Sequence, residues 1–200
     1  TNRARNVHEL RDTRNAAKEL PAGITAARIY ERREIDHALP EGAVHQGFAL
    51  KASALESEHI NAVVDPTHGA LLVLDQITDP HNVGAILRSA TALGADAVIT
   101  TTRHSPTESG VMAKAASGAL DLIKVLTVVN LARTLESLGK EGYLRLALDS
   151  DGEVPIEAAH RADRLALVLG AEGKGVRPGV KAACDQVVRL DVPGPIKSLN

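Results

Sequence analysis

The sequence has almost no aromatic side chains and a single cysteine. Phe, Tyr and Trp together make up 2% of the 200 residues, and Trp is absent. The core must therefore be built from Leu, Val, Ile and Ala, and a nucleic-acid platform based on aromatic stacking is disfavoured. Cys184 has no second cysteine to pair with. This excludes an internal disulfide and an all-cysteine metal site, and it fits a reducing compartment.

Long hydrophobic runs are also missing. No apolar stretch approaches the roughly 20 residues that a membrane-spanning helix needs, and no secretory signal is recognisable. We therefore expect a cytoplasmic protein with no membrane partner. The eight His residues show no metal-ligand spacing, so we also expect no metal.

Charge is distributed unevenly along the chain. Residues 1–33 contain eight Lys/Arg and four Asp/Glu, a balance of +4, whereas residues 34–200 contain 15 and 21, a balance of −6. A basic leading segment attracts phosphates, so nucleic-acid binding is one interpretation. A solvated helix face explains the same charges, and charge alone does not decide between the two.

The chain reads as two domains. Residues 1–55 form a small α/β domain, 56–69 a linker and 70–200 a larger domain. In the small domain we expect a charged helix over 3–20, a short strand over 24–30, a short helix over 34–39 and a strand over 45–50. The small domain looks incomplete at its start.

The larger domain alternates strands with helices. We expect strands over 71–75, 97–101, 122–129, 144–148, 165–169 and 187–190, and helices over 82–94, 108–116, 131–142 and 176–184. Strands that are apolar throughout and alternate with helices favour an α/β fold with a mostly parallel sheet and helices on both faces. Ligands bind such sheets at the carboxyl ends of the strands. The loops after Asp75, Leu169 and Leu190 are therefore the candidate site.

The first of these loops leads into a helix with two polar residues of interest. Asn82 lies at the start of the helix. Arg88 lies about 140° around the helix from Val83, away from the apolar stripe. The two residues are candidates for a polar active-site pair. The alternative is an Asn that caps the helix and an Arg on its surface.

The second loop, Gly170–Gly175, has the spacing Gly-x-x-Gly-x-Gly. Glycines let the backbone approach a ligand closely, but this spacing is neither the dinucleotide fingerprint nor a phosphate loop. Glu172 has no evident structural task in this loop, although it could cap the next helix. The third stretch ends in Ser198-Leu199-Asn200, which reads as the start of another helix, so we expect the native sequence to continue.

Together the three stretches resemble a known family. Asp79-Pro80-x-Asn82-x-Gly84-x-x-x-Arg88, Gly170-x-Glu172-x-x-Gly175 and Ser198-Leu199-Asn200 are similar, in order and spacing, to the motifs of the SPOUT-class TrmH family. Members of this family are RNA ribose 2′-O-methyltransferases that use S-adenosylmethionine. The resemblance implies a homodimer whose active sites use both subunits and a deep trefoil knot near the C-terminus that forms the cofactor pocket.

The resemblance also assigns roles to residues. Backbone contacts to the cofactor are implied for Gly170, Leu190 and Leu199. The polar active-site set is Asn82, Arg88, Glu172, Ser198 and Asn200. One departure is Leu190-Asp191-Val192, where relatives commonly have Ile-Pro-Met. The helix expected after Asn200 is the second departure, because the given chain stops before it.

His45-Gln46-Gly47 followed by an apolar strand resembles the end of the small substrate-binding domain in one branch of the family. This branch methylates a guanosine ribose in 23S ribosomal RNA, so residues 1–55 are expected to be part of an RNA-binding domain. Three alternatives stay open. They are a tRNA 2′-O-methyltransferase, an RNA-binding protein that has lost methyl transfer, and an oxidoreductase, although the last lacks the usual Gly-x-Gly-x-x-Gly.

Overall fold

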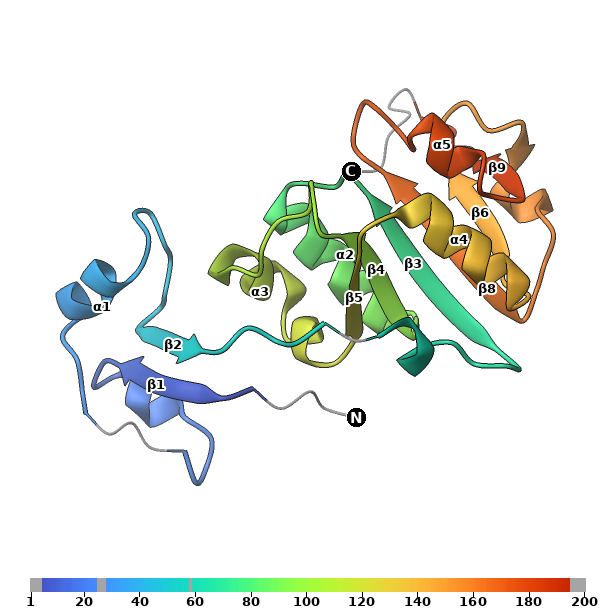
Figure 1. Cartoon of the computed structure of the whole chain (residues 1–200). Helices are drawn as coiled ribbons and strands as arrows, with labels where there is room; N and C mark the ends of the chain where they lie inside the picture. Colours follow the sequence, from blue (N-terminus) through green and yellow to red (C-terminus); the bar gives the residue numbers. More distant parts are fainter. Residues whose placement is uncertain (1–4, 25–27, 58, 195–200) are drawn as a thin grey trace. The chain divides into compact units, whose positions relative to one another are not determined.

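The computed structural model describes residues 5–24, 28–57 and 59–194 (Figure 1). The chain divides into two compact units, a smaller one over Arg3–Leu55 and a larger one that contains Glu56–Asn200. No described helix is long and apolar enough to cross a membrane.

The larger unit is an α/β structure, as predicted. Its strands are β3 (Gly69–Asp75), β4 (Ala97–Thr101), β5 (Lys124–Val128), β6 (Leu144–Leu148), β7 (Val154–Pro155), β8 (Arg164–Gly170) and β9 (Gln186–Arg189). Its α-helices are α2 (Pro80–Ala92), α3 (Gly110–Ala116), α4 (Leu131–Lys140) and α5 (Pro178–Lys181). The strands form one seven-stranded sheet in the order β5-β4-β3-β8-β6-β9-β7, and every neighbouring pair is parallel.

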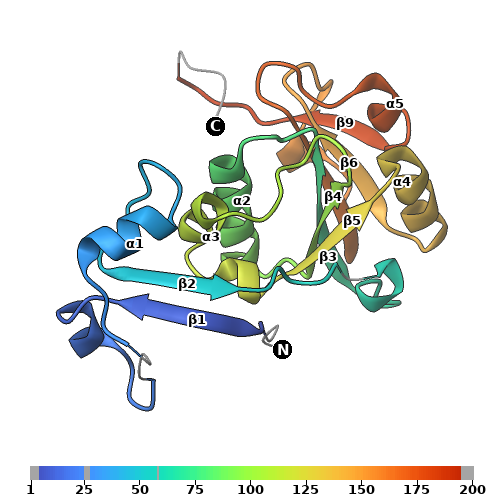
Figure 2. The same ribbon diagram turned by 60° about the vertical axis from the view of Figure 1, so that its left-hand side comes forward.

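Both faces of this sheet are buried, which explains why its strands are apolar throughout. Leu71 and Val73 of β3 belong to a core that includes Leu135 of α4, whereas Leu74 of the same strand packs with Leu87 of α2. Successive side chains of a strand point to opposite faces. Helices α2 and α3 therefore cover one face, and α4 and α5 cover the other (Figure 2).

The sheet has a topological switch point at β3 and β8, where the strands on one side are connected in one direction and those on the other side in the opposite direction. From β3 the chain builds outward through β4 and β5, then crosses to the other half of the sheet for β6, and later returns to insert β8 between β3 and β6. The last residues of β3 and β8, Asp75 and Gly170, lie opposite each other in the parallel register. Such a switch point is where parallel α/β sheets bind ligands.

The smaller unit corrects one prediction. The helix expected over residues 3–20 is wrong, because Val7–Asp12 is a strand (β1) followed by a short 3-10 helix, Ala16–Glu19. β1 pairs antiparallel with β2 (Phe48–Ala52). Cross-strand pairing outweighs the helical propensity of this charged segment, which is the usual reason why a local preference fails.

The helix predicted over 34–39 and the strand predicted over 45–50 are found close to their expected places, as α1 (Arg32–Ala38) and β2. Helix α1 begins with a capping box, in which Glu31 and Glu34 each bond the other's backbone N–H. The strand predicted over 24–30 includes residues 25–27, which lie outside the described residues. Ile29 forms an isolated bridge with Asp12.

Candidate active site

The loop after β3 ends in a well-formed helix start. Asp79 is the N-cap of α2, and its Oδ1 accepts a hydrogen bond of 3.0 Å from the His81 N–H. Pro80 occupies the first helical position, where its missing N–H costs nothing. The helix thus begins two residues before the predicted start at Asn82, and Asn82 is not its cap.

Gly84 of the first motif has a packing role. A Cβ at this position would lie 2.5 Å from the Met112 carbonyl oxygen and 2.7 Å from the Ala115 Cβ. Backbone and small side chains of α3 therefore approach α2 at this point more closely than any side chain would allow. This contact fixes the position of α2, the helix that carries Asn82 and Arg88.

Asn82 and Arg88 are not brought together within one chain. Asn82 is half-buried and Arg88 is exposed. They are six positions apart on the helix, which corresponds to about 9 Å along the axis and about 120° around it. Among the residues that the structure describes, neither side chain has a hydrogen-bond or ion-pair partner.

The glycine loop, Gly170–Gly175, is a tight turn that packs against itself. The Gly175 N–H donates to the Ala171 carbonyl at 2.8 Å, and these two residues form an isolated antiparallel bridge. A Cβ on Gly170 would lie 2.1 Å from the Gly175 carbonyl carbon. We expected Gly170 to be needed for close approach of a ligand, but the loop's own backbone already requires a glycine there.

Glu172 is exposed near the tip of the glycine loop. The alternative that it caps the next helix is not seen, because the N-cap of α5 is Arg177 and no side chain bonds to the cap there. Gly173 follows with a φ of +73°, and no atom of the described residues beyond its own chain neighbours lies within 4 Å of where its Cβ would be. The tip of the loop is therefore not packed against the rest of the described chain.

Two buried carboxylates stand beside this loop. Asp75 is fully buried, and its two oxygens accept from the Arg177 N–H and from the Arg177 Nε, both at 2.8 Å. The Asp149 side chain is 7% exposed and accepts from the Val176 N–H at 2.8 Å. The sequence pattern placed a candidate loop after Asp75 but did not indicate Asp149 or Arg177. The available signal was an Asp directly after a buried strand, at its carboxyl end.

A lysine neutralises the second of these carboxylates. The Lys181 Nζ lies 2.9 Å from the Asp149 Oδ2 and 2.9 Å from the Asp151 Oδ1. Burial favours the neutral acid, but the hydrogen bonds from Lys181 and from the Val176 N–H outweigh this effect and lower the pKa of Asp149 to about 2. Asp149 is thus ionised at neutral pH, although its side chain is only 7% exposed.

The third stretch is only partly described. Leu190 follows β9 and is 41% exposed. Asp191, the acid of the first departure from the family pattern, forms an ion pair of 2.8 Å with the Arg189 Nε. Arg189 in turn donates to the Gly152 carbonyl at 3.0 Å. Asp191 therefore helps to join β9 to the loop after β6. Ser198, Leu199 and Asn200 lie outside the described residues.

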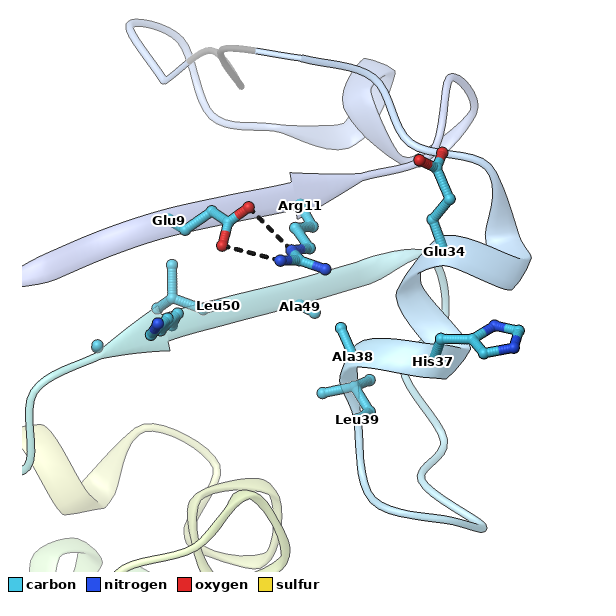
Figure 3. A pocket seen from close by; sticks show the side chains of 10 residues that line it. Glu9, Arg11, Glu34, His37, Ala38, Leu39, Ala49 and Leu50 are labelled. Atoms are coloured by element: carbon cyan, nitrogen blue, oxygen red, sulfur yellow. Dashed lines mark hydrogen bonds and ion pairs between the residues drawn. The ribbon is translucent and has the colours of Figure 1, made fainter.

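A separate pocket of about 670 Å³ lies in the smaller unit, between α1 and β2 (Figure 3). Its charges are mixed, because Arg11 and Lys51 are offset by Glu9 and Glu34, and Arg11 pairs with Glu9 at 2.9 Å. None of its lining residues belongs to the three motifs. The described residues contain no cluster of His, Cys, Asp or Glu that could hold a metal ion.

Comparison with known proteins decides the family. Residues 69–200 match the SpoU rRNA methylase family. The chain belongs to this family. The resemblance drawn from the three motifs is thereby confirmed, and the matched residues span the whole sheet and all three candidate loops.

Curated SpoU-family relatives are similar over most of the chain. It is 41% identical over 175 residues to a 23S rRNA (guanosine-2′-O-)-methyltransferase RlmB of Pseudomonas syringae pv. tomato, which covers 85% of this chain and 69% of the relative. It is also 41% identical over 159 residues to the protein of the same name from Ralstonia nicotianae, covering 78% of this chain and 64% of the relative. The chain thus spans about two thirds of the length of these relatives.

A solved structure supports the SpoU fold. The SpoU methyltransferase AviRb from Streptomyces viridochromogenes, in complex with the cofactor AdoMet, superimposes with a TM-score of 0.81 and 19% identity. The superposition covers 99% of this chain and 78% of AviRb. At this identity the likeness shows the fold, a parallel α/β sheet of the SpoU type.

Proposed function

We propose that this protein transfers a methyl group from S-adenosylmethionine to a ribose 2′-hydroxyl of RNA, and that the target is a guanosine in 23S ribosomal RNA. The observation that carries this proposal is the 41% identity over 175 residues to a curated 23S rRNA (guanosine-2′-O-)-methyltransferase. That alignment covers 85% of this chain, which is more than the catalytic unit alone. Ribosomal RNA is therefore favoured over tRNA as the substrate. We also propose the cytoplasm as the place of action.

The carboxyl edge of the sheet fits an adenosyl cofactor. The tip of the glycine loop at Gly173 is not packed against the rest of the described chain, and Leu190 offers an exposed apolar side chain. β8 and β9 are separated only by β6, so their ends lie about 10 Å apart, close to the length of a nucleoside. We assign the backbone contacts to the cofactor to Gly170, Leu190 and Leu199.

Methyl transfer to a hydroxyl depends on positioning and on stabilisation of charge. S-adenosylmethionine supplies an activated methyl group, so the protein needs no covalent intermediate. The bond from the methyl carbon to the sulfonium sulfur breaks as the bond to the 2′-oxygen forms, which leaves a neutral thioether, and the 2′-hydroxyl proton passes to solvent water. Arg88 carries a permanent positive charge at neutral pH because the reference pKa of arginine is above about 12. We assign to Arg88 the stabilisation of the developing oxyanion and the binding of an adjacent phosphate, rather than removal of the proton.

The remaining polar residues would shape the same site. We assign to Asn82 and Glu172 the orientation of the ribose and of Arg88, and to Ser198 and Asn200 the wall of the pocket. Asn82 and Arg88 lie about 9 Å apart along α2. We therefore propose that Asn82 orients Arg88 through the bound RNA or through a second subunit. We propose a homodimer whose active sites use both subunits, as the family resemblance implies. A C-terminal trefoil knot that completes the pocket belongs to the same proposal.

Replacement of Arg88 tests the proposed function. We expect Arg88→Ala to bind S-adenosylmethionine within about twofold of the unaltered protein, since the side chain does not belong to the glycine loop. Methylation of unmodified 23S rRNA should fall by roughly 10²–10³-fold, as for the loss of one oxyanion donor. Calorimetry measures the first quantity and transfer of a labelled methyl group the second.

Arg133→Ala is the matched control, because Arg133 is an exposed arginine on α4, which packs on the other face of the sheet. Substantial residual methylation by Arg88→Ala would remove Arg88 from the catalytic set. Methylation of tRNA in place of 23S rRNA by the unaltered protein would change the assigned substrate. Cofactor binding without any transfer would indicate a non-catalytic member of the family.

A further inference from the structure

The segment that leaves the glycine loop is held by carboxylates from both neighbouring strands. β8 lies between β3 and β6, and the glycine loop follows it. The Val176 N–H donates to Asp149, which directly follows β6, and the next N–H, that of Arg177, donates to Asp75, the last residue of β3. Two successive amides are thus fixed by two acids on opposite sides of the strand.

Each of the two acids has a cation beside it, and Lys181 also pairs with Asp151. The Arg177 guanidinium lies 2.7 Å from the Asp75 Oδ1, and the Lys181 Nζ lies 2.9 Å from the Asp149 Oδ2. Buried carboxylates are retained only when paired and hydrogen-bonded, and such charge-assisted bonds are stronger than bonds between neutral groups. The two acids are therefore able to hold the segment rigidly.

The loop fits closely against one of these acids. A Cβ on Gly175 would lie 2.3 Å from the Asp149 Oδ2, so only a glycine allows this approach. Gly175 also adopts a φ of +64°, which side chains disfavour. The position of Asp149 therefore determines where the far end of the glycine loop lies.

The same acid lies between the two loops assigned to the cofactor. β6, which ends immediately before Asp149, is the strand between β8 and β9. Gly170 ends β8 and Leu190 follows β9, so Asp149 is placed at the strand end between them. A shift of its carboxylate would therefore change the surface between the two loops assigned to the cofactor.

We propose that Asp75 and Asp149 are positioning residues that hold the glycine loop in the conformation that receives S-adenosylmethionine, an inference that rests on the proposed function. They act through the backbone of Val176 and Arg177, and neither acid takes part in the transfer itself. The two carboxylates, with the Val176 and Arg177 amides that they accept from, form a clamp on the loop. Preorganised sites lose affinity when their support is removed, so loss of either carboxylate weakens cofactor binding while the sheet stays folded.

The test compares Asp149→Ala, which removes both the charge and the acceptor, with Asp149→Asn, which keeps one oxygen for the Val176 N–H. Calorimetry with S-adenosylmethionine should show a Kd about tenfold or more higher for Asp149→Ala, in line with the effect of small misplacements at binding sites. The Kd of Asp149→Asn should be intermediate. Asp75→Asn should weaken binding in the same direction, and if this variant does not fold, the Asp149 pair decides.

Asp185→Ala is the control for the possibility that Asp149 contributes only to the stability of the fold. Asp185 accepts from the Arg145 N–H at 2.8 Å and pairs with its guanidinium, but it lies at the amino ends of β6 and β9. Its loss should lower the melting temperature and leave the Kd unchanged. An unchanged Kd in Asp149→Ala, or an equal rise in the Asp185 control, overturns the proposal.

Amide hydrogen exchange in the cofactor-free protein tests the clamp independently of the proposed function. Exchange of the Val176 and Arg177 amides should accelerate in Asp149→Ala and stay unchanged in the Asp185 control. If the unaltered protein binds no S-adenosylmethionine, the proposed function fails, and this exchange still decides whether the carboxylate holds the loop. Unchanged exchange at both amides overturns the clamp, whatever the cofactor does.

Discussion

Gly84 lies in the first motif, between Asn82 and Arg88, yet the structure assigns it a role in packing rather than in chemistry. We therefore predict that Gly84→Ala lowers the free energy of unfolding. The new Cβ would lie 2.5 Å from the Met112 carbonyl oxygen and 3.0 Å from the Ala116 nitrogen, both of them backbone atoms. Normal contact distances are about 1 Å longer, so α2 and α3 would have to move apart.

The magnitude follows from two opposing effects. Overpacking a tight contact costs about 1–3 kcal/mol, and backbone atoms that cannot rotate away place this case near the upper limit. Alanine gains about 1 kcal/mol over glycine in a helix. We expect a net loss of about 2 kcal/mol in the free energy of unfolding, which corresponds to a drop in melting temperature of roughly 4–8 °C for a unit of this size.

Urea denaturation measures the loss as a shift of the midpoint at constant slope. Gly110→Ala is the control, because no described atom outside its own helix and chain neighbours lies within 4 Å of its Cβ position at the start of α3. We expect this variant to be neutral or stabilised by up to about 1 kcal/mol. A Gly84→Ala protein as stable as the unaltered one would show that the helices are not in such close contact.

Two further predictions concern buried carboxylates. The folded pKa of Asp149, about 2, lies below its ordinary value of 3.8, so Asp149 contributes about 2 kcal/mol of stability above pH 4 that is lost as the pH falls toward 2. In acid titrations followed by circular dichroism, Asp149→Asn should remove this part of the pH dependence, and an identical acid profile would contradict the assigned ion pair. Asp12 of β1 is fully buried, and neither of its oxygens has a hydrogen-bond partner among the described residues. Asp12→Asn should therefore slow amide exchange in β1 and β2 by stabilising the smaller unit by about 1 kcal/mol or more, and faster exchange would show that the carboxylate has a partner.

The sequence predicted the elements of the larger unit well, because its strands and helices have clear apolar patterns. The segments 97–101 and 144–148 agree with β4 and β6. The two-residue strand β7 was not predicted, since it is too short to show a period. In the smaller unit, Val7–Asp12 mixes charged and apolar residues without a decisive period, so the local pattern did not separate helix from strand.

The site was predicted only in part, for a physical reason. Motif spacing identified the loops and the family, but it could not show which groups meet in space. Arg177 bonds to Asp75 across 102 residues, and Val176 bonds to Asp149 across 27. Such contacts depend on the insertion of β8 between β3 and β6, which no local pattern reveals. For the same reason Gly170 was interpreted as a point of close approach for a ligand, whereas the backbone of its own loop already requires a glycine there.

The late insertion of β8 has a consequence for how the protein folds. β8 joins the half-sheet β5-β4-β3 to the half-sheet β6-β9-β7, so the two halves share no ladder until residues 164–170 are in place. Its pairing with β3 closes a loop of about 95 residues, which costs roughly 4 kcal/mol of chain entropy, and such non-local pairing is slow. A nascent chain that stops before this strand would expose unpaired strand edges. The glycine loop therefore forms only when the two halves of the sheet unite, so folding of the core and assembly of the site are one cooperative event.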